Sequence, residues 1–123
     1  MHYVILCYDS EATVEAWTKD QEQGEMARLG AARERLANAG RLGPVARLMP
    51  TTAATTLRKG RVPVVLDGPF AETKEQLLGF YVVHCETLEE ALEAARQLAE
   101  ASSTSGCLEV RPIATYAPEA RGS

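Results

Sequence analysis

The densest cluster of chemically active side chains lies between residues 67 and 75, in the run DGPFAETKE. Carboxylates, a hydroxyl and an ammonium group follow one another there within a single predicted loop. A carboxylate can act as a general base, and an ammonium group can stabilise negative charge that develops on a substrate. We therefore predict Asp67, Glu72 and Lys74 as candidate catalytic residues. The alternative is structural: Asp-Gly-Pro is typical of a turn, Phe70 would anchor the loop in the core, and the other charges would be solvated.

Further residues are candidate ligand-binding groups of the same predicted pocket: Phe70 and Thr73 in this loop, Asp9 after the first strand, and Tyr81 in a later strand. Polar groups of these kinds fix the orientation of ligands in otherwise apolar pockets. The structural alternatives are a turn or helix cap at Asp9 and a packing role for Tyr81. No metal-ligand spacing, phosphate-binding loop or nucleophile motif occurs, so we predict neither a metal nor a cofactor. The histidines, His2 and His84, are interpreted as incidental.

The elements that must position these groups follow from hydrophobic spacing. Thr18 with Gln21, and Thr87 with Glu90, have the spacing of capping boxes that begin two helices, and Gly43 interrupts a strand. The predicted order is a strand at 3–8, a helix at 19–39, a strand at 41–49, a hairpin at 55–58 and 62–66 and a strand at 79–85. A helix from the cap at Thr87 to residue 101 and a strand at 108–113 follow. This order is βαββαβ with an inserted β-hairpin, so the predicted fold class is ferredoxin-like α+β.

The two strands that this fold places at the centre, residues 3–8 and 79–85, are apolar on both faces. In a ferredoxin-like fold both helices cover one face of the sheet, so the other face is bare in a monomer. Burial of apolar surface is worth about 25 cal/mol per Å², and large exposed apolar patches usually mark an interface. We therefore predict a homodimer that packs sheet against sheet.

The composition fits a single folded domain. The 123 residues are 46% hydrophobic and 24% charged, which suits one core and excludes a disordered chain. We predict one domain over residues 1–116 and a frayed tail over 117–123. A net charge of −4 without a basic run argues against direct nucleic-acid binding. Three cysteines without a CxxC pair, no signal-peptide pattern and no apolar span predict a cytoplasmic protein that does not enter a membrane.

The run DGPFAETKE and the QLLGFYVV that follows it resemble the signature of the DGPF group of YCII-related proteins. The first strand and the EVRP segment at 109–112 resemble this group too, so the resemblance covers almost the whole chain. It implies a bacterial protein, built as a dimeric α+β barrel of ferredoxin-like protomers, and it implies no particular reaction. Similar domains of the wider group have been suspected of catalysis because of a His and Asp pair with the His on the first helix. This chain departs from that pattern, because residues 19–39 contain no histidine.

Two functions remain open at this point. The first is a homodimer with a small-molecule pocket, with acid/base chemistry on a small organic substrate if the protein is an enzyme. The alternative is a non-catalytic interaction or regulatory module, since relatives are often encoded beside, or fused to, extracytoplasmic-function sigma factors. A cavity lined by Asp67, Glu72 or Lys74 would favour the pocket, whereas the same side chains in solvent would favour the module.

Overall fold

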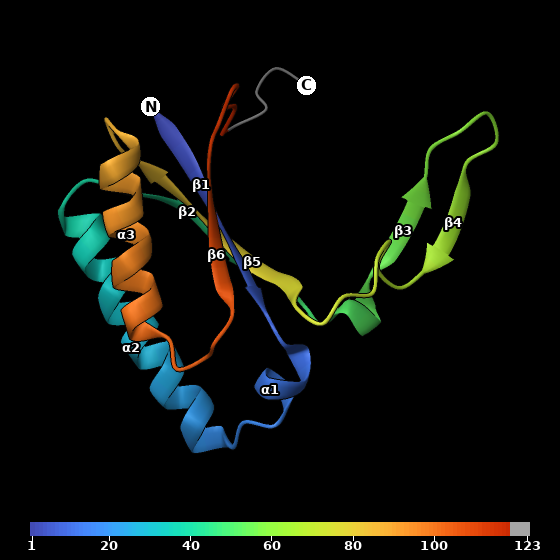
Figure 1. Ribbon diagram of the computed structural model, residues 1–123, viewed down its shortest axis with the longest axis horizontal. Coiled ribbons are helices and arrows are strands. Elements are labelled where there is room, and N and C mark those ends of the chain that lie inside the picture. The colour runs from blue at the N-terminus through green and yellow to red at the C-terminus, as the bar shows by residue number, and fades with distance from the viewer. Residues whose placement is uncertain (119–123) are drawn as a thin grey trace.

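The chain forms a four-stranded sheet with two long helices on one face and a separate two-stranded hairpin on the other side (Figure 1). The computed structural model describes residues 1–118, so residues 119–123 of the predicted tail lie outside the described part. The elements are β1 (His2–Asp9), α1 (Glu11–Glu15), α2 (Lys19–Asn38), β2 (Leu42–Arg47), the 3-10 turn η1 (Thr51–Ala53), β3 (Thr55–Arg58), β4 (Val64–Asp67), β5 (Gln76–His84), α3 (Leu88–Ala101) and β6 (Cys107–Pro112).

The sheet order is β2-β5-β1-β6, and each neighbouring pair is antiparallel. This is the arrangement of a ferredoxin-like α+β fold, and it confirms the fold class predicted from the order of elements. The strands predicted to be central, β1 and β5, are the inner strands. The hairpin β3–β4 pairs only with itself in the described structure and does not join this sheet.

The helix ends follow from local side chains. At the start of α2, the Thr18 hydroxyl accepts from the Gln21 N–H and the Gln21 side chain accepts from the Thr18 N–H, so the predicted capping box is present. Gly40 has a φ of 73° directly after this helix, a conformation that favours glycine. At α3 the Thr87 hydroxyl caps the Glu90 N–H, but the Glu90 carboxylate accepts from the Glu86 N–H. The second predicted box is therefore only half formed.

Most strand boundaries differ from the prediction by one or two residues, and two differences are larger. The short helix α1 was not predicted; Ser10 caps it by accepting from the Thr13 N–H. Strand β5 begins at Gln76, three residues before the predicted start at Gly79. The predicted irregularity near Gly43 is confirmed, because the register of β2 on β5 shifts between Leu42 and Val45.

The core lies between the sheet and the helices. Alternate residues of the central strands point toward the helices, and Ile5 and Val83 are fully buried there. They pack with Leu36 of α2 and Leu98 of α3, which are each 1% exposed. One charged side chain, Glu25, is also buried at 2% exposure. Hydrogen bonds from Arg28, Ser102 and Ser103 to its carboxylate compensate for the burial of this charge.

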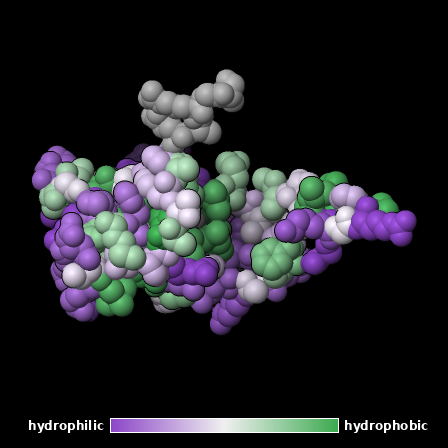
Figure 2. Space-filling view, turned by 90° about the horizontal axis from the view of Figure 1, so that it is seen from above, coloured by the Kyte–Doolittle hydropathy of each residue, from purple (hydrophilic) through white to green (hydrophobic). Residues whose placement is uncertain are grey.

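The opposite face of the sheet carries no helix (Figure 1). Val4 and Leu6 on β1 lie directly opposite Val82 and Phe80 on β5, and all four point to this open face. The hairpin β3–β4 stands away from the face and extends beyond the body of the molecule (Figures 1 and 2). It carries exposed apolar side chains: Leu57, Val62, Val64, Val65 and Leu66. The exposed apolar surface is therefore on the hairpin, while on the open face Val4, Leu6 and Phe80 are half-buried and Val82 is buried.

Candidate functional site

A cavity of about 280 Å³ lies on the helix side of the sheet, between β1, β5, α1 and α2. Most of its lining is apolar, as is usual for small-molecule sites. The apolar wall includes Val14, Trp17, Met26, Leu29, Leu78 and Leu98. Residues of β2, α3, β6 and the loop before β6 add to the lining, and the cavity opens to solvent. The polar groups within this wall are few, and they define what the cavity can bind.

Tyr81 is the tyrosine of the central strands that lines the cavity from β5. Burial raises the pKa of Tyr81, and the neighbouring Cys7 adds to this effect, while the Arg33 guanidinium opposes it. No hydrogen bond engages the hydroxyl of Tyr81 within residues 1–118, whereas the hydroxyl of Tyr8 donates to Glu109 at 3.2 Å. The Tyr81 hydroxyl is therefore protonated at neutral pH and free to donate to a ligand.

Asp9 supplies a carboxylate at the end of β1. Its Oδ1 accepts from the Ser10 N–H at 3.2 Å, and its Oδ2 accepts from the Thr104 hydroxyl. The chain comes very close at Gly106, where an added Cβ would lie 2.0 Å from the carbonyl oxygen of Tyr8 and 2.7 Å from Cγ of Asp9. Only glycine fits this approach, so the loop from Ser102 to Gly106 fixes the position of the carboxylate.

Glu25 is the buried acid of the site. Its carboxylate accepts from the Ser102 hydroxyl at 2.8 Å, from the Ser103 N–H at 3.0 Å and hydroxyl at 2.7 Å, and from Arg28 at 2.9 Å. Burial acts to raise the pKa of Glu25, but the hydrogen bonds from Ser103, Ser102 and Arg28 outweigh it, so the pKa is lowered. The group is ionised, and its oxygens are committed to holding α2 against the end of α3.

Cys7 also lines the cavity but is not a nucleophile at neutral pH. Burial, helped by the negative charge of Asp9, raises the pKa of this thiol to about 11. A thiol with such a pKa carries almost no thiolate near pH 7. Cys7 therefore acts as a small apolar wall residue, as its place in an apolar strand led us to expect.

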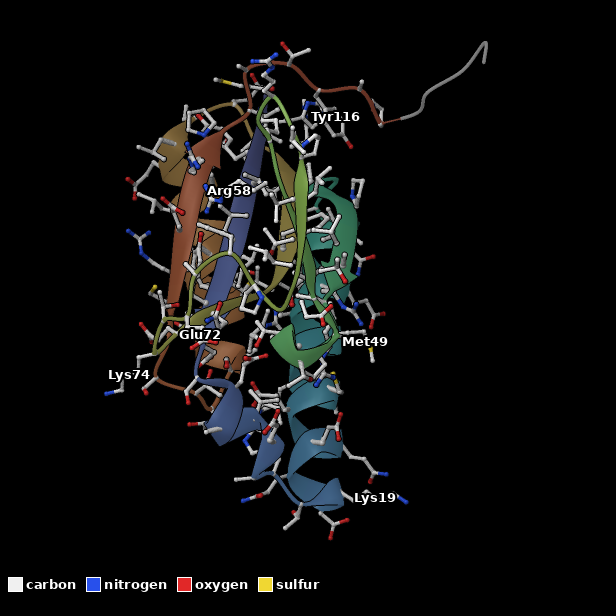
Figure 3. The ribbon with its side chains drawn as sticks, turned by 90° about the vertical axis from the view of Figure 1, so that its right-hand side faces the viewer. Lys19, Met49, Arg58, Glu72, Lys74 and Tyr116 are labelled. Atoms are coloured by element: carbon white, nitrogen blue, oxygen red, sulfur yellow. The ribbon has the colours of Figure 1, made fainter. Side chains whose placement is uncertain are left out.

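The structure separates the predicted site residues into two groups. Asp9 and Tyr81 both line the cavity. Asp67, Glu72, Lys74, Thr73 and Phe70 are exposed and do not line it. Figure 3 shows Glu72 and Lys74 at the outer edge of the loop that leads from the hairpin, with Lys74 pointing away from the body. Phe70 is 80% exposed, so the interpretation that it anchors the loop in this chain's own core is wrong.

Sequence reasoning missed Arg33, Trp17 and the buried Glu25 as members of the site. Arg33 and Glu25 lie on the long helix α2 between other charged residues, where a pattern of surface charge gives no sign of which side chain faces the sheet. Trp17 lies between α1 and α2 and lines the cavity. The isolated tryptophan was the one available signal, because a large aromatic next to a helix start usually packs against a neighbouring element.

Comparison with known proteins gives the family of this chain. The family model of the YCII-related domain matches residues 1–117. An uncharacterised protein of Rhizobium meliloti (strain 1021) is 52% identical over 119 residues, which cover 96% of this chain and 96% of that protein. The chain therefore belongs to the YCII-related family. None of the helices within residues 1–118 has the length and hydrophobicity needed to cross a membrane.

Proposed function

We propose that the cavity beside Tyr81 binds a small organic ligand and that Asp9 and Tyr81 carry out proton transfer on it. The observation that supports this proposal is the free Tyr81 hydroxyl in a mostly apolar cavity that also contains a carboxylate. Asp9 is the base in this scheme, and Tyr81 donates a hydrogen bond to the oxygen on which negative charge develops. If the ligand is only bound, the same two groups orient it.

The charge near Tyr81 favours a ligand with an anionic group. Arg33 lies close enough to oppose the rise in the pKa of Tyr81, and it forms no ion pair among the residues that the structure describes. The neighbouring Arg47, by contrast, is paired with Glu22 at 3.4 Å. A guanidinium group binds a carboxylate by two parallel hydrogen bonds. The preferred ligand is therefore a small apolar carboxylic acid.

A thermal-shift screen of a metabolite library tests the proposal on the wild type, Tyr81→Phe and Asp9→Asn. Tyr116→Phe is the matched control, because it removes a tyrosine hydroxyl outside the cavity. We expect small carboxylates to raise the melting temperature of the wild type and of the control, with smaller shifts for the two cavity variants. A library in which no compound stabilises the wild type would overturn the proposal.

The homodimer is part of the same proposal. The open sheet face and the exposed hairpin are both apolar, and an isolated two-stranded hairpin is only marginally stable in water. Contact with a second copy would cover both surfaces. In such a dimer the exposed Asp67 at the end of β4 and the loop residues Phe70, Glu72, Thr73 and Lys74 would lie beside the partner chain, and a contribution of their side chains to a ligand site is part of this proposal.

Sedimentation velocity over a micromolar concentration range tests the dimer. Val65 is 65% exposed on β4, so Val65→Lys removes apolar contact area without disturbing this chain's core. Thr55→Lys on β3 is the control at a polar, exposed position of the same hairpin. We expect a dimer for the wild type and the control and a weakened one for Val65→Lys. A monomeric wild type at these concentrations would contradict the dimer.

Asp67→Asn, screened with the same ligands, tests whether the side chain of Asp67 contributes to ligand binding.

The second candidate is a non-catalytic module that docks onto an extracytoplasmic-function sigma factor. The exposed apolar hairpin favours it, because such a surface suits a protein partner. Binding of a purified sigma factor that Val65→Lys abolishes, together with a library that yields no ligand, would support this alternative. The three free cysteines support a cytoplasmic location under either function.

A further inference from the structure

His2 and His84 form a direct cross-strand pair on the open face of the sheet. His2 begins β1, His84 ends β5, and the two are register partners. Their backbone groups do not bond to each other. The His84 N–H donates to the Arg41 carbonyl at 2.7 Å, next to β2, and the His2 carbonyl accepts from the Ile113 N–H at 2.9 Å, next to β6. They are therefore a non-hydrogen-bonded pair, the kind in which facing side chains come closest.

The separation of the two rings fits a shared metal ion. The ring centroids lie 5.0 Å apart with an interplanar angle of 56°. With metal–nitrogen bonds of about 2.0–2.1 Å, two imidazoles on one ion have centroids roughly 4.5 Å apart at a right angle and about 5.2 Å apart at the tetrahedral angle. The observed distance lies within this range, so the spacing of the two rings matches that of two imidazoles on one ion.

A third ring packs beside the pair. The ring centroids of Tyr116 and His2 are 4.1 Å apart, and the two ring planes form an angle of 33°. Tyr116 lies at the end of the sheet where β1 begins (Figure 3). This contact restricts the His2 side chain, which lowers the entropy cost of binding. The His2–His84 pair ends the ladder between β1 and β5, outside the apolar pairs that the proposed dimer would cover, and His84 is exposed, so an ion can approach from solvent. Arg111 and Glu109 of β6 point to the same face opposite Val4 and Leu6, and their charges offset each other.

We propose that His2 and His84 bind one divalent transition-metal ion of the class that prefers imidazole, such as Zn²⁺ or Ni²⁺. This goes beyond the prediction of a metal-free protein and is independent of the cavity. No group of three or more possible metal ligands occurs among residues 1–118, so water completes the coordination. Such a site holds its ion loosely and leaves positions open for a further ligand.

Isothermal titration of untagged, metal-free protein with Zn²⁺ and with Ni²⁺ tests the site. The informative variant is His84→Gln, because it leaves the chain terminus and His2 unchanged. Tyr116→Phe is the control, since it keeps the ring that packs on His2. We expect one ion per chain for the wild type and the control, and at least about tenfold weaker binding for His84→Gln, because the second imidazole acts as an intramolecular ligand. Circular dichroism in chelator verifies that the variant is folded.

A spectroscopic measurement identifies the ligands directly. Paramagnetic Ni²⁺ broadens the side-chain resonances of the histidines that bind it, and we expect both His2 and His84 to lose intensity together in the wild type. Equal Ni²⁺ affinity for the wild type and His84→Gln would overturn the proposal. So would broadening of His2 alone, since that result would show that His84 does not bind the ion.

Discussion

Glu25 on α2 accepts hydrogen bonds from both the backbone N–H and the hydroxyl of Ser103, a residue 78 positions later in the chain. Ser103 belongs to the loop that joins α3 to β6, and Arg28 strengthens the connection by donating to the Ala101 carbonyl at 3.1 Å. The same loop carries Thr104, which donates to Asp9. The buried carboxylate therefore holds in place the loop that positions the proposed base, so the stability of the fold and the geometry of the cavity are linked.

Replacement of this carboxylate should destabilise the protein. Glu25→Gln keeps the shape of the side chain but turns one acceptor into a donor that faces N–H and O–H groups. The loss of charged hydrogen bonds at a buried position predicts a decrease of about 2–3 kcal/mol in the free energy of unfolding. Urea denaturation measures it. Glu22→Gln, at a half-exposed ion pair with Arg47, is the matched control and should change stability by less than about 1 kcal/mol. Equal effects would refute the role of Glu25.

The lowered pKa of Glu25 predicts the direction of the pH dependence. The unfolded chain takes up the proton at a higher pH than the folded chain, so the contribution of Glu25 is fully present above its ordinary pKa, near 4.5. It is lost as the pH falls from that value through the lower pKa of the folded state. We expect the free energy of unfolding of the wild type to decrease below about pH 5 more steeply than that of Glu25→Gln. Parallel curves for the two proteins would contradict this.

The sequence was sufficient for the architecture because its signals are local. The capping residue Thr18, the stop at Gly40 and the period of the central strands each act within a few residues, and together they determine the order of elements. The cavity was harder to predict, since it depends on contacts between distant segments. Asp9 and Tyr81 could be proposed from their places in strands, but no local pattern tells which face of α2 carries Glu25 and Arg33 toward the sheet.

The most conspicuous motif also shows the limit of sequence reasoning. Five charged or hydroxyl-bearing residues of DGPFAETKE are exposed at the end of β4 and in the loop that follows it, and a short spacing along the chain does not place them around a cavity. His2 and His84 show the opposite case: they are far apart in the sequence but direct neighbours in the sheet. Strand register, which depends on the whole sheet, brings such residues together.

The close approach at Gly106 predicts a strong effect of one added methyl group. Gly106→Ala would put a Cβ 2.0 Å from the Tyr8 carbonyl oxygen. This contact is too short to exist, so the backbone would have to move. We expect a loss of about 3 kcal/mol or more in the free energy of unfolding, and weaker ligand binding because Asp9 is displaced. Gly30→Ala is the control: nothing lies nearer than 4.0 Å to its Cβ position within α2, so it should stabilise the protein by about 0.5–1 kcal/mol. Similar stabilities for both variants would refute the steric argument.

The three cysteines should differ sharply in reactivity. Cys107 is exposed at the start of β6, whereas Cys85 is 1% exposed and Cys7 has a pKa of about 11. Because the thiolate is the reactive form, we expect a disulfide reagent at pH 8 to modify one thiol rapidly in the folded protein and the other two only after unfolding. Cys107→Ser should abolish the rapid phase and leave the slow one. Rapid modification of Cys7 in that variant would show that this thiol ionises near neutral pH, contrary to its raised pKa.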